Sequence, residues 1–254
     1  MKKRAMAAVS AVMCASMVLS ACGSSASTST TAAPAETKAA EESKAEETTA
    51  AAASGDVVTI NIGFENTTEE PIGQAVEKWA ELLKEESNGT MELKVFANSA
   101  LGNKSKLIDQ MVMGENVITI ADGAFYADYG VPDLGILYGP FFFDNWDEVW
   151  KLIDSDWYKD QCSKLADKGL TVLGSNWIYG ERELMTKDKA VVPADIKGKK
   201  IRLANSQIYV EGFNALGATA VPMALGDVYT ALQNGTLDGV ENPLSTLYGQ
   251  SFQE

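Results

Sequence analysis

The chain has 254 residues, a formal net charge of −14 and a hydrophobic content of 46%. This length is enough for a sizeable core and for two lobes. A surface this acidic argues against nucleic acid or anionic lipid as a partner, so that any bound anion must be captured by a local cationic site.

The N-terminus has the pattern of a bacterial lipoprotein signal. The basic start Met1–Arg4 precedes an apolar run, Ala5–Leu19, which is too short to span a bilayer comfortably. The run ends in Leu19-Ser20-Ala21-Cys22, which resembles a lipobox, whose cysteine is acylated and becomes the new N-terminus. The alternative is an ordinary secretory signal cleaved after Ala21. We expect a signal peptide at 1–21, lipidation at Cys22 and a cell-membrane location on the extracytoplasmic face.

Residues 22–55 are rich in Ser, Thr and Ala and contain no aromatic or bulky aliphatic side chain. Such a stretch cannot bury enough apolar surface to fold, and it is predicted to be a disordered tether.

The remaining residues alternate between strand and helix patterns. Strands are expected at Val57–Phe64, Met91–Phe96, Val117–Ala121, Leu170–Leu173 and Lys200–Ala204. Helices are expected from Pro71 to Asn88-Gly89, at Lys104–Met113, in one or two segments before Gly169, before Gly217, and at Asp227–Asn234. This alternation predicts an α/β fold with mostly parallel sheets flanked by helices. Ligands of such sheets bind beyond the carboxyl ends of the strands.

The sequence gives little support to an enzyme. Histidine is absent, which removes the commonest general base and the commonest metal ligand. No Gly-x-Gly-x-x-Gly motif, phosphate-binding loop or paired Cys or His with metal-ligand spacing is present. Cys162 is the single cysteine beyond the N-terminal segment, so no disulfide can form there. We therefore expect no catalytic activity, no cofactor and no metal; an extracellular lyase or hydrolase is the disfavoured alternative.

Two arginines are the candidates for anion capture, because a guanidinium binds a carboxylate through two parallel hydrogen bonds and stays charged. On a strand, Arg202 points to the face opposite Ile201 and Leu203, and in a buried sheet it needs a carboxylate partner from the protein or from a ligand. On pattern alone, the alternative to ligand binding, which is an ion pair within the protein or a strand end in water, is about equally favoured. Arg182 lies between two glutamates, and on pattern alone a solvated strand-end charge is the favoured interpretation.

The segments around these arginines resemble the solute-binding subunits of TRAP (tripartite ATP-independent periplasmic) transporters, in the C4-dicarboxylate-binding branch. Three blocks carry the resemblance in order and spacing: Asp195–Arg202 (DIKGKKIR), Gly217–Met223 (GATAVPM) and Val228–Pro243 (VYTALQNGTLDGVENP). Weaker agreement runs back through Leu137–Phe142 to Asn61–Gly63.

The resemblance implies a two-lobed, periplasmic-binding-protein-like fold, with one lobe at 56–179 and a second at 180–254. Members of the family continue past the Glu-Asn-Pro segment, so the second lobe is expected to be incomplete here. The implied function is capture of a small organic carboxylate, such as a dicarboxylate, sugar acid or keto acid, for the transporter membrane subunits. A sensory lipoprotein that presents the ligand to a receptor is the alternative.

The resemblance also implies roles for individual residues. Arg202 matches the arginine that pairs with the ligand carboxylate, Arg182 a second arginine that assists it, and Asn242 an asparagine bonded to the same group. Sialic-acid-binding members have ligand-facing residues at four further positions, and this chain has different residues there: Glu65, Lys104, Asp122 and Leu225. These departures argue against sialic acid, and Lys104 is a candidate for meeting the second carboxylate of a dicarboxylate.

Overall fold

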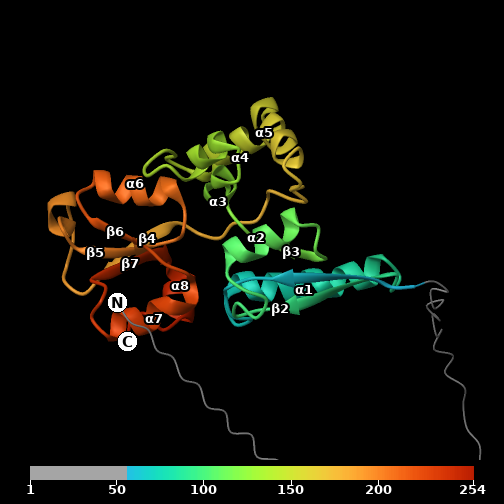
Figure 1. Cartoon of the computed structure of the whole chain (residues 1–254), viewed down its shortest axis with the longest axis horizontal. Coiled ribbons are helices and arrows are strands. Elements are labelled where there is room, and N and C mark those ends of the chain that lie inside the picture. The colour runs from blue at the N-terminus through green and yellow to red at the C-terminus, as the bar shows by residue number, and fades with distance from the viewer. Residues whose placement is uncertain (1–55) are drawn as a thin grey trace, which may run out of the picture. The chain divides into compact units, whose positions relative to one another are not determined.

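The computed structural model describes residues 56–254, which form two β-sheets (Figure 1). The first sheet has the strand order β2-β1-β3 and the second β4-β7-β5-β6. Neighbouring strands are parallel except for β4 and β7, which are antiparallel. The predicted α/β class with mostly parallel sheets is confirmed. The signal peptide, Cys22 and the tether fall outside the described residues.

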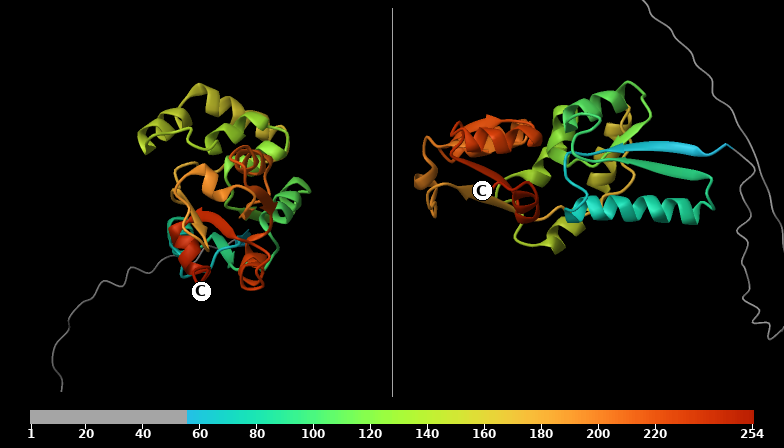
Figure 2. Two further views of the ribbon diagram at one scale, coloured as in Figure 1. Left: turned by 90° about the vertical axis from the view of Figure 1, so that its left-hand side faces the viewer. Right: turned by 90° about the horizontal axis from the view of Figure 1, so that it is seen from below.

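The first sheet is formed within residues 58–119. Its elements are β1 (Val58–Gly63), α1 (Pro71–Glu86), β2 (Met91–Phe96), α2 (Lys104–Val112) and β3 (Val117–Thr119). Helix α1 packs along β2 (Figure 2, right), and α2 packs against β3. Ile62, Phe64 and Leu93 from the strand region are buried against Val76 of α1. All five elements match those predicted from the apolar periodicity of the sequence.

The segment between the sheets is helical. It contains α3 (Gly123–Asp128), the 3-10 helix η1 (Pro132–Tyr138), α4 (Trp146–Ile153) and α5 (Asp156–Ala166). The strand predicted at Leu170–Leu173 does not form. Leu170 is instead buried in a cluster with Leu165 of α5, whereas Leu173 is 69% exposed. The apolar run at Leu170–Leu173 therefore reflects a loop that packs on α5, not a strand that pairs with a sheet.

The second sheet contains β4 (Arg182–Thr186), β5 (Lys200–Leu203), β6 (Thr219–Pro222) and β7 (Gly239–Pro243). Its helices are α6 (Gln207–Ala215), α7 (Val228–Gln233) and α8 (Leu244–Gly249), with 3-10 turns η2 (Pro193–Ile196) and η3 (Leu225–Asp227). Figure 1 shows α6 on one face of this sheet and α7 and α8 on the other. Ile201 and Leu203 pack with Tyr209 of α6, and Val240 packs with Val228 of α7 and Leu247 of α8.

The register of the second sheet places its polar residues on two different faces. Arg202 pairs with Val240, so Arg202 and Asn242 lie on the same face, which is that of α7 and α8. Arg182 pairs with Pro243, so Arg182 and Glu241 share the opposite face, which is that of α6. Because β4 runs antiparallel, its first residue Arg182 lies at the same edge as the carboxyl ends of β5 and β7. Both arginines therefore reach the edge at which a ligand is expected.

None of the helices between residues 56 and 254 has the length and apolarity needed to cross a lipid bilayer.

Candidate functional site

Arg202 is buried in the second sheet, with 3% of its surface exposed. Its Nε and Nη2 donate hydrogen bonds to the Met223 carbonyl at 2.9 and 2.6 Å, whereas Nη1 is buried and has no partner. Within residues 56–254, no carboxylate forms an ion pair with Arg202. Burial lowers the pKa of Arg202 from its ordinary value, although the carboxylates of Glu241 and Glu65 oppose this. A guanidinium has five N–H groups, so those left over at Nη1 and Nη2 form an end-on pair that fits a carboxylate.

Asn242 is the second polar residue on this face with an unmet hydrogen bond. It is 4% exposed, and its Oδ1 is buried without a partner. Buried polar atoms without partners are uncommon in folded proteins and call for a ligand, a water or a function. Both residues were predicted to contact the ligand carboxylate. The free Nη1 of Arg202 is a donor that a carboxylate can satisfy, whereas the free Oδ1 of Asn242 is an acceptor, so Asn242 can meet a carboxylate only by donating from Nδ2.

A small cavity lies next to Arg202. Met223, Glu65 and Lys104 are among the residues that line it. Its volume of about 10 Å³ is enough for at most one water molecule. The structure thus brings three predicted site residues around one cavity: Arg202 of β5, Glu65 of the loop that follows β1, and Lys104 at the start of α2.

Arg182 is occupied within the protein. Its Nε lies 2.5 Å from Glu241 Oε2 and its Nη2 lies 2.8 Å from Oε1, a bidentate ion pair between diagonal neighbours of β4 and β7. The guanidinium also lies over the Tyr209 ring, 4.7 Å from its centroid. Burial opposes the charge, yet Tyr209 and Glu241 together raise the pKa of Arg182 above its ordinary value. The favoured interpretation of Arg182 as a solvated charge is therefore wrong, since only 22% of its side chain is exposed.

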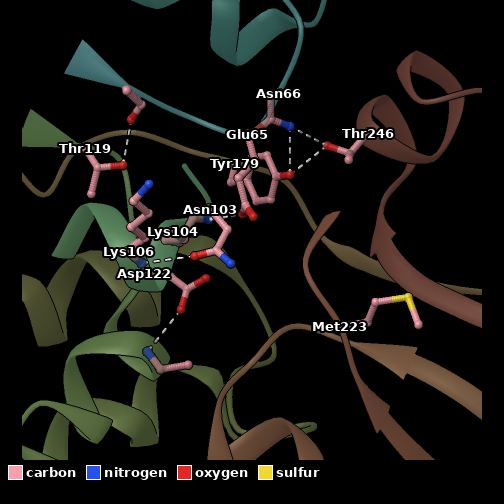
Figure 3. Close-up of polar contacts among 12 residues, drawn as sticks. Glu65, Asn66, Asn103, Lys104, Lys106, Thr119, Asp122, Tyr179, Met223 and Thr246 are labelled. Carbon is pink, nitrogen blue, oxygen red and sulfur yellow. Dashed lines mark hydrogen bonds and ion pairs between the residues drawn. The ribbon is translucent and has the colours of Figure 1, made fainter. Parts of the chain in front are cut away.

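Lys104 and Glu65 face one another across the first sheet's edge (Figure 3). Lys104 Nζ lies 4.0 Å from Glu65 Oε2, and the two side chains are only 16% and 9% exposed. The ammonium also lies 4.9 Å from the centroid of the Phe125 ring, a cation–π distance. Lys104 therefore already has a carboxylate of the protein at ion-pair distance.

Asp122 begins helix α3 and has its carboxylate in the same region. Its Oδ1 accepts a hydrogen bond from the Ala124 amide at 3.0 Å, as expected of an N-cap, and Tyr209 Oη lies 3.5 Å from Oδ2. Burial raises the pKa of the Asp122 carboxyl, and the charges of Lys104 and Arg182 partly offset this.

A hydrogen-bond network joins the β1–α1 loop to α8, and sequence reasoning missed it; Figure 3 shows its Asn66, Tyr179 and Thr246. Asn66 Nδ2 lies 3.0 Å from Tyr179 Oη and 3.2 Å from Thr246 Oγ1, and these two oxygens are 2.7 Å apart. The same Nδ2 donates to Glu70 at 2.7 Å, and Glu70 accepts from Gln250 at 2.7 Å. We call these five residues the polar clasp. It connects the β1–α1 loop to α8, and Asn66 and Thr246 in these two segments are 180 residues apart in the sequence.

A larger cavity of about 1490 Å³ adjoins the charged residues. Lys104 lines both cavities, and Asp122, Arg182 and Glu241 line the larger one. Leu225 lines neither; it is 4% exposed and packs into the core with Val228 and Leu247. The structure therefore does not bring Leu225 to the other predicted site residues. Over the described range 56–254, no group of His, Cys, Asp and Glu side chains is arranged to hold a metal ion.

Comparison with protein families settles the family. The model of the DctP family, bacterial extracellular solute-binding protein family 7, matches residues 62–254. The chain belongs to this family. The resemblance to TRAP solute-binding subunits is thereby confirmed, as is the expected type of fold.

Two curated relatives of this family 7 protein are named as periplasmic binding proteins. The 2,3-diketo-L-gulonate-binding periplasmic protein YiaO of Escherichia coli (strain K12) is 32% identical over 198 residues, covering 77% of this chain and 60% of the relative. The C4-dicarboxylate-binding periplasmic protein DctP of Rhodobacter capsulatus is 29% identical over 202 residues, covering 80% of this chain and 60% of the relative. The chain thus spans 60% of the length of each of these relatives.

Solved structures of the family are similar to the structure of this chain. A TRAP periplasmic solute-binding protein from Ochrobacterium anthropi with bound L-fuconate is 42% identical and has a TM-score of 0.75, covering 78% of this chain and 65% of the other. A protein of the same kind from Actinobacillus succinogenes 130z with bound L-galactonate is 38% identical and has a TM-score of 0.75, covering 77% and 64%.

Proposed function

We propose that this family 7 protein is an extracytoplasmic solute-binding lipoprotein that captures a small organic carboxylate, with sugar acids as the first candidates, for a TRAP-type secondary transporter. The observation that carries the proposal is the buried guanidinium of Arg202, whose Nη1 has no partner and which faces a cavity. An incompletely bonded cation in this position is arranged to receive an anion.

In this mechanism the ligand carboxylate docks end-on against Nη1 and Nη2 of Arg202. The Met223 carbonyl holds the guanidinium in place through Nε and Nη2. Asn242, on the same face, supplies an additional hydrogen bond once its amide turns toward the ligand. Closure of the two lobes, 56–179 and 180–254, then excludes water and strengthens the ion pair. The remaining hydrogen bonds are needed because a buried ion pair is favourable only when they are satisfied.

Arg182 plays an indirect part in this scheme. Its ion pair with Glu241 occupies Nε and Nη2 and sets its position at the sheet edge. It assists the ligand through its charge, whereas Arg202 makes the direct contact.

The similar structures support a sugar acid as ligand. L-Fuconate and L-galactonate, bound by the two proteins described above, each combine one carboxylate with a chain of hydroxyl groups. A carboxylate for Arg202 and hydroxyls for the polar side chains of Glu65, Lys104 and Asp122 would use every charged side chain predicted at the site except Arg182, which is paired with Glu241.

The test is a thermal-shift screen of the purified protein with organic acids, followed by titration calorimetry of each hit. Arg202→Lys keeps a positive charge but loses the end-on pair of N–H groups, and it should weaken every hit by about 100-fold. Lys200→Met is the matched control, because Lys200 is an exposed cation on the same strand. Unchanged affinity in Arg202→Lys would refute the proposed role of Arg202.

The anchor is tested separately. Labelling of cells with palmitate should mark the protein, and Cys22→Ser should abolish the label and release the protein from the membrane. Label that survives in Cys22→Ser would exclude Cys22 as the lipidation site. Delivery predicts uptake of the ligand only when this protein is expressed together with the TRAP membrane subunits.

A further inference from the structure

Lys104 already has a carboxylate of the protein beside it. Its ammonium lies 4.0 Å from the Glu65 carboxylate and 4.9 Å from the centroid of Phe125. Both charged side chains are largely buried, so water does little to screen them. A second ligand carboxylate at this point would have to compete with Glu65 for Lys104.

Asp122 makes the region still less favourable to an anion. Its carboxyl lies near enough to feel the charges of Lys104 and Arg182, and Arg182 is already paired with Glu241. Whether ionised or protonated, Asp122 adds no positive charge. We call Glu65, Lys104 and Asp122 the acidic cluster, since its side chains carry two carboxyl groups and one ammonium.

The acidic cluster borders both cavities. Lys104 and Glu65 line the small cavity with Arg202, whose Nη1 is buried and unpaired, and Lys104 lines the larger cavity with Asp122. A ligand that docks its carboxylate on Arg202 and places its chain in the larger cavity would pass Lys104, the cluster residue that lines both. Carboxylates accept hydrogen bonds from hydroxyls and an ammonium donates to them, so the cluster can serve a polyol chain.

From this arrangement we propose that the acidic cluster selects a polyhydroxylated monocarboxylate over a dicarboxylate of the same chain length. This inference rests on the proposed function, and it replaces the expectation that Lys104 meets a second carboxylate. The selectivity has two parts. The carboxyl groups of Glu65 and Asp122 repel a second carboxylate of the ligand. A ligand without hydroxyls leaves the buried polar groups of the cluster without hydrogen-bond partners, which weakens its binding.

The experiment compares three ligands on the purified protein by titration calorimetry. L-Galactonate has hydroxyls and one carboxylate; galactarate has the same chain with both ends oxidised to carboxylates; adipate is a dicarboxylate of the same length without hydroxyls. Galactonate should bind at least about tenfold more tightly than galactarate, and adipate should bind more weakly still.

Glu65→Gln releases the charge of Lys104 and should shift the galactarate-to-galactonate affinity ratio at least about tenfold toward galactarate. Glu69→Gln is the matched control, because Glu69 is exposed and four residues further along; it should leave the ratio unchanged. Asp122→Asn provides a second variant, with the same direction of change, if Glu65→Gln does not fold.

The outcomes separate the two proposals. If galactonate binds and Arg202→Lys abolishes binding, but galactarate binds as tightly and the cluster variants leave the ratio unchanged, the selectivity proposal is overturned and the proposed function stands. If a folded protein binds no organic acid at all, the proposed function fails and the selectivity fails with it.

Discussion

The ion pair between Arg182 and Glu241 should be a major contributor to the stability of the second sheet. Glu241→Gln keeps the shape of the side chain but removes its charge, and it turns an amide group toward a guanidinium that can only donate. Glu241 is 3% exposed, so water cannot replace the lost interaction with Arg182.

The size of the effect follows from the geometry. Breaking a fully buried ion pair by removing one partner costs about 3–5 kcal/mol. Here Arg182 keeps 22% of its side chain exposed and retains its contact with the Tyr209 ring, so we expect a loss of about 2–4 kcal/mol in the free energy of unfolding.

Urea denaturation followed by circular dichroism measures this loss. Glu183→Gln is the control, because Glu183 is an exposed neighbour of Arg182 on β4 and should change stability by less than about 0.5 kcal/mol. A double-mutant cycle with Arg182→Met should return a coupling energy of about 1–3 kcal/mol. If Glu241→Gln destabilises no more than Glu183→Gln, the ion pair does not stabilise the sheet and the reasoning is wrong.

Three further predictions follow from close contacts and buried groups. Gly73→Ala should destabilise by about 2–3 kcal/mol in the same assay, because its Cβ would lie 2.1 Å from the Thr67 carbonyl, whereas Gly226→Ala, with open space, should be nearly neutral. Thr246→Val removes a hydroxyl from the polar clasp and should cost about 1–2 kcal/mol; a neutral result would show that the clasp is not needed. Burial raises the pKa of Asp122, so its ionisation lowers the stability of the folded protein as the pH rises from about 4 through that raised pKa. The stability of Asp122→Asn relative to wild type should therefore increase with pH over this window, and a flat difference would contradict the assigned shift.

Local periodicity was sufficient to predict the first sheet. The strand at Met91–Phe96 and the helix from Pro71 present apolar residues at the spacing of one buried face, and strands and helices alternate along this part of the chain. The same reasoning failed at β7. Gly239–Pro243 contains Glu241, Asn242 and a proline, which is an unusual composition for a strand, yet all five residues are buried because β7 lies between β4 and β5.

Local alternation along a strand predicted part of the candidate site, whereas contacts between distant segments could not be predicted. Alternation along β5 indicated that Arg202 points to the face opposite Ile201 but left its burial open, and the structure shows that it is buried. The partner of Arg182 was not predictable, because Glu241 is 59 residues away and is brought to Arg182 only by the register of β4 and β7. The signal that could have found it was a lone glutamate beside Asn242 in the Glu-Asn-Pro block. The polar clasp gave no such local signal, since Asn66 and Thr246 come together only when both sheets have formed.

A crystal structure of the protein with bound L-galactonate would show directly whether Arg202 binds the ligand carboxylate. We predict that the carboxylate lies within hydrogen-bonding distance of Nη1 of Arg202, with the hydroxyl chain passing Lys104 toward Asp122. A carboxylate held elsewhere, with Nη1 of Arg202 still unpaired, would contradict it.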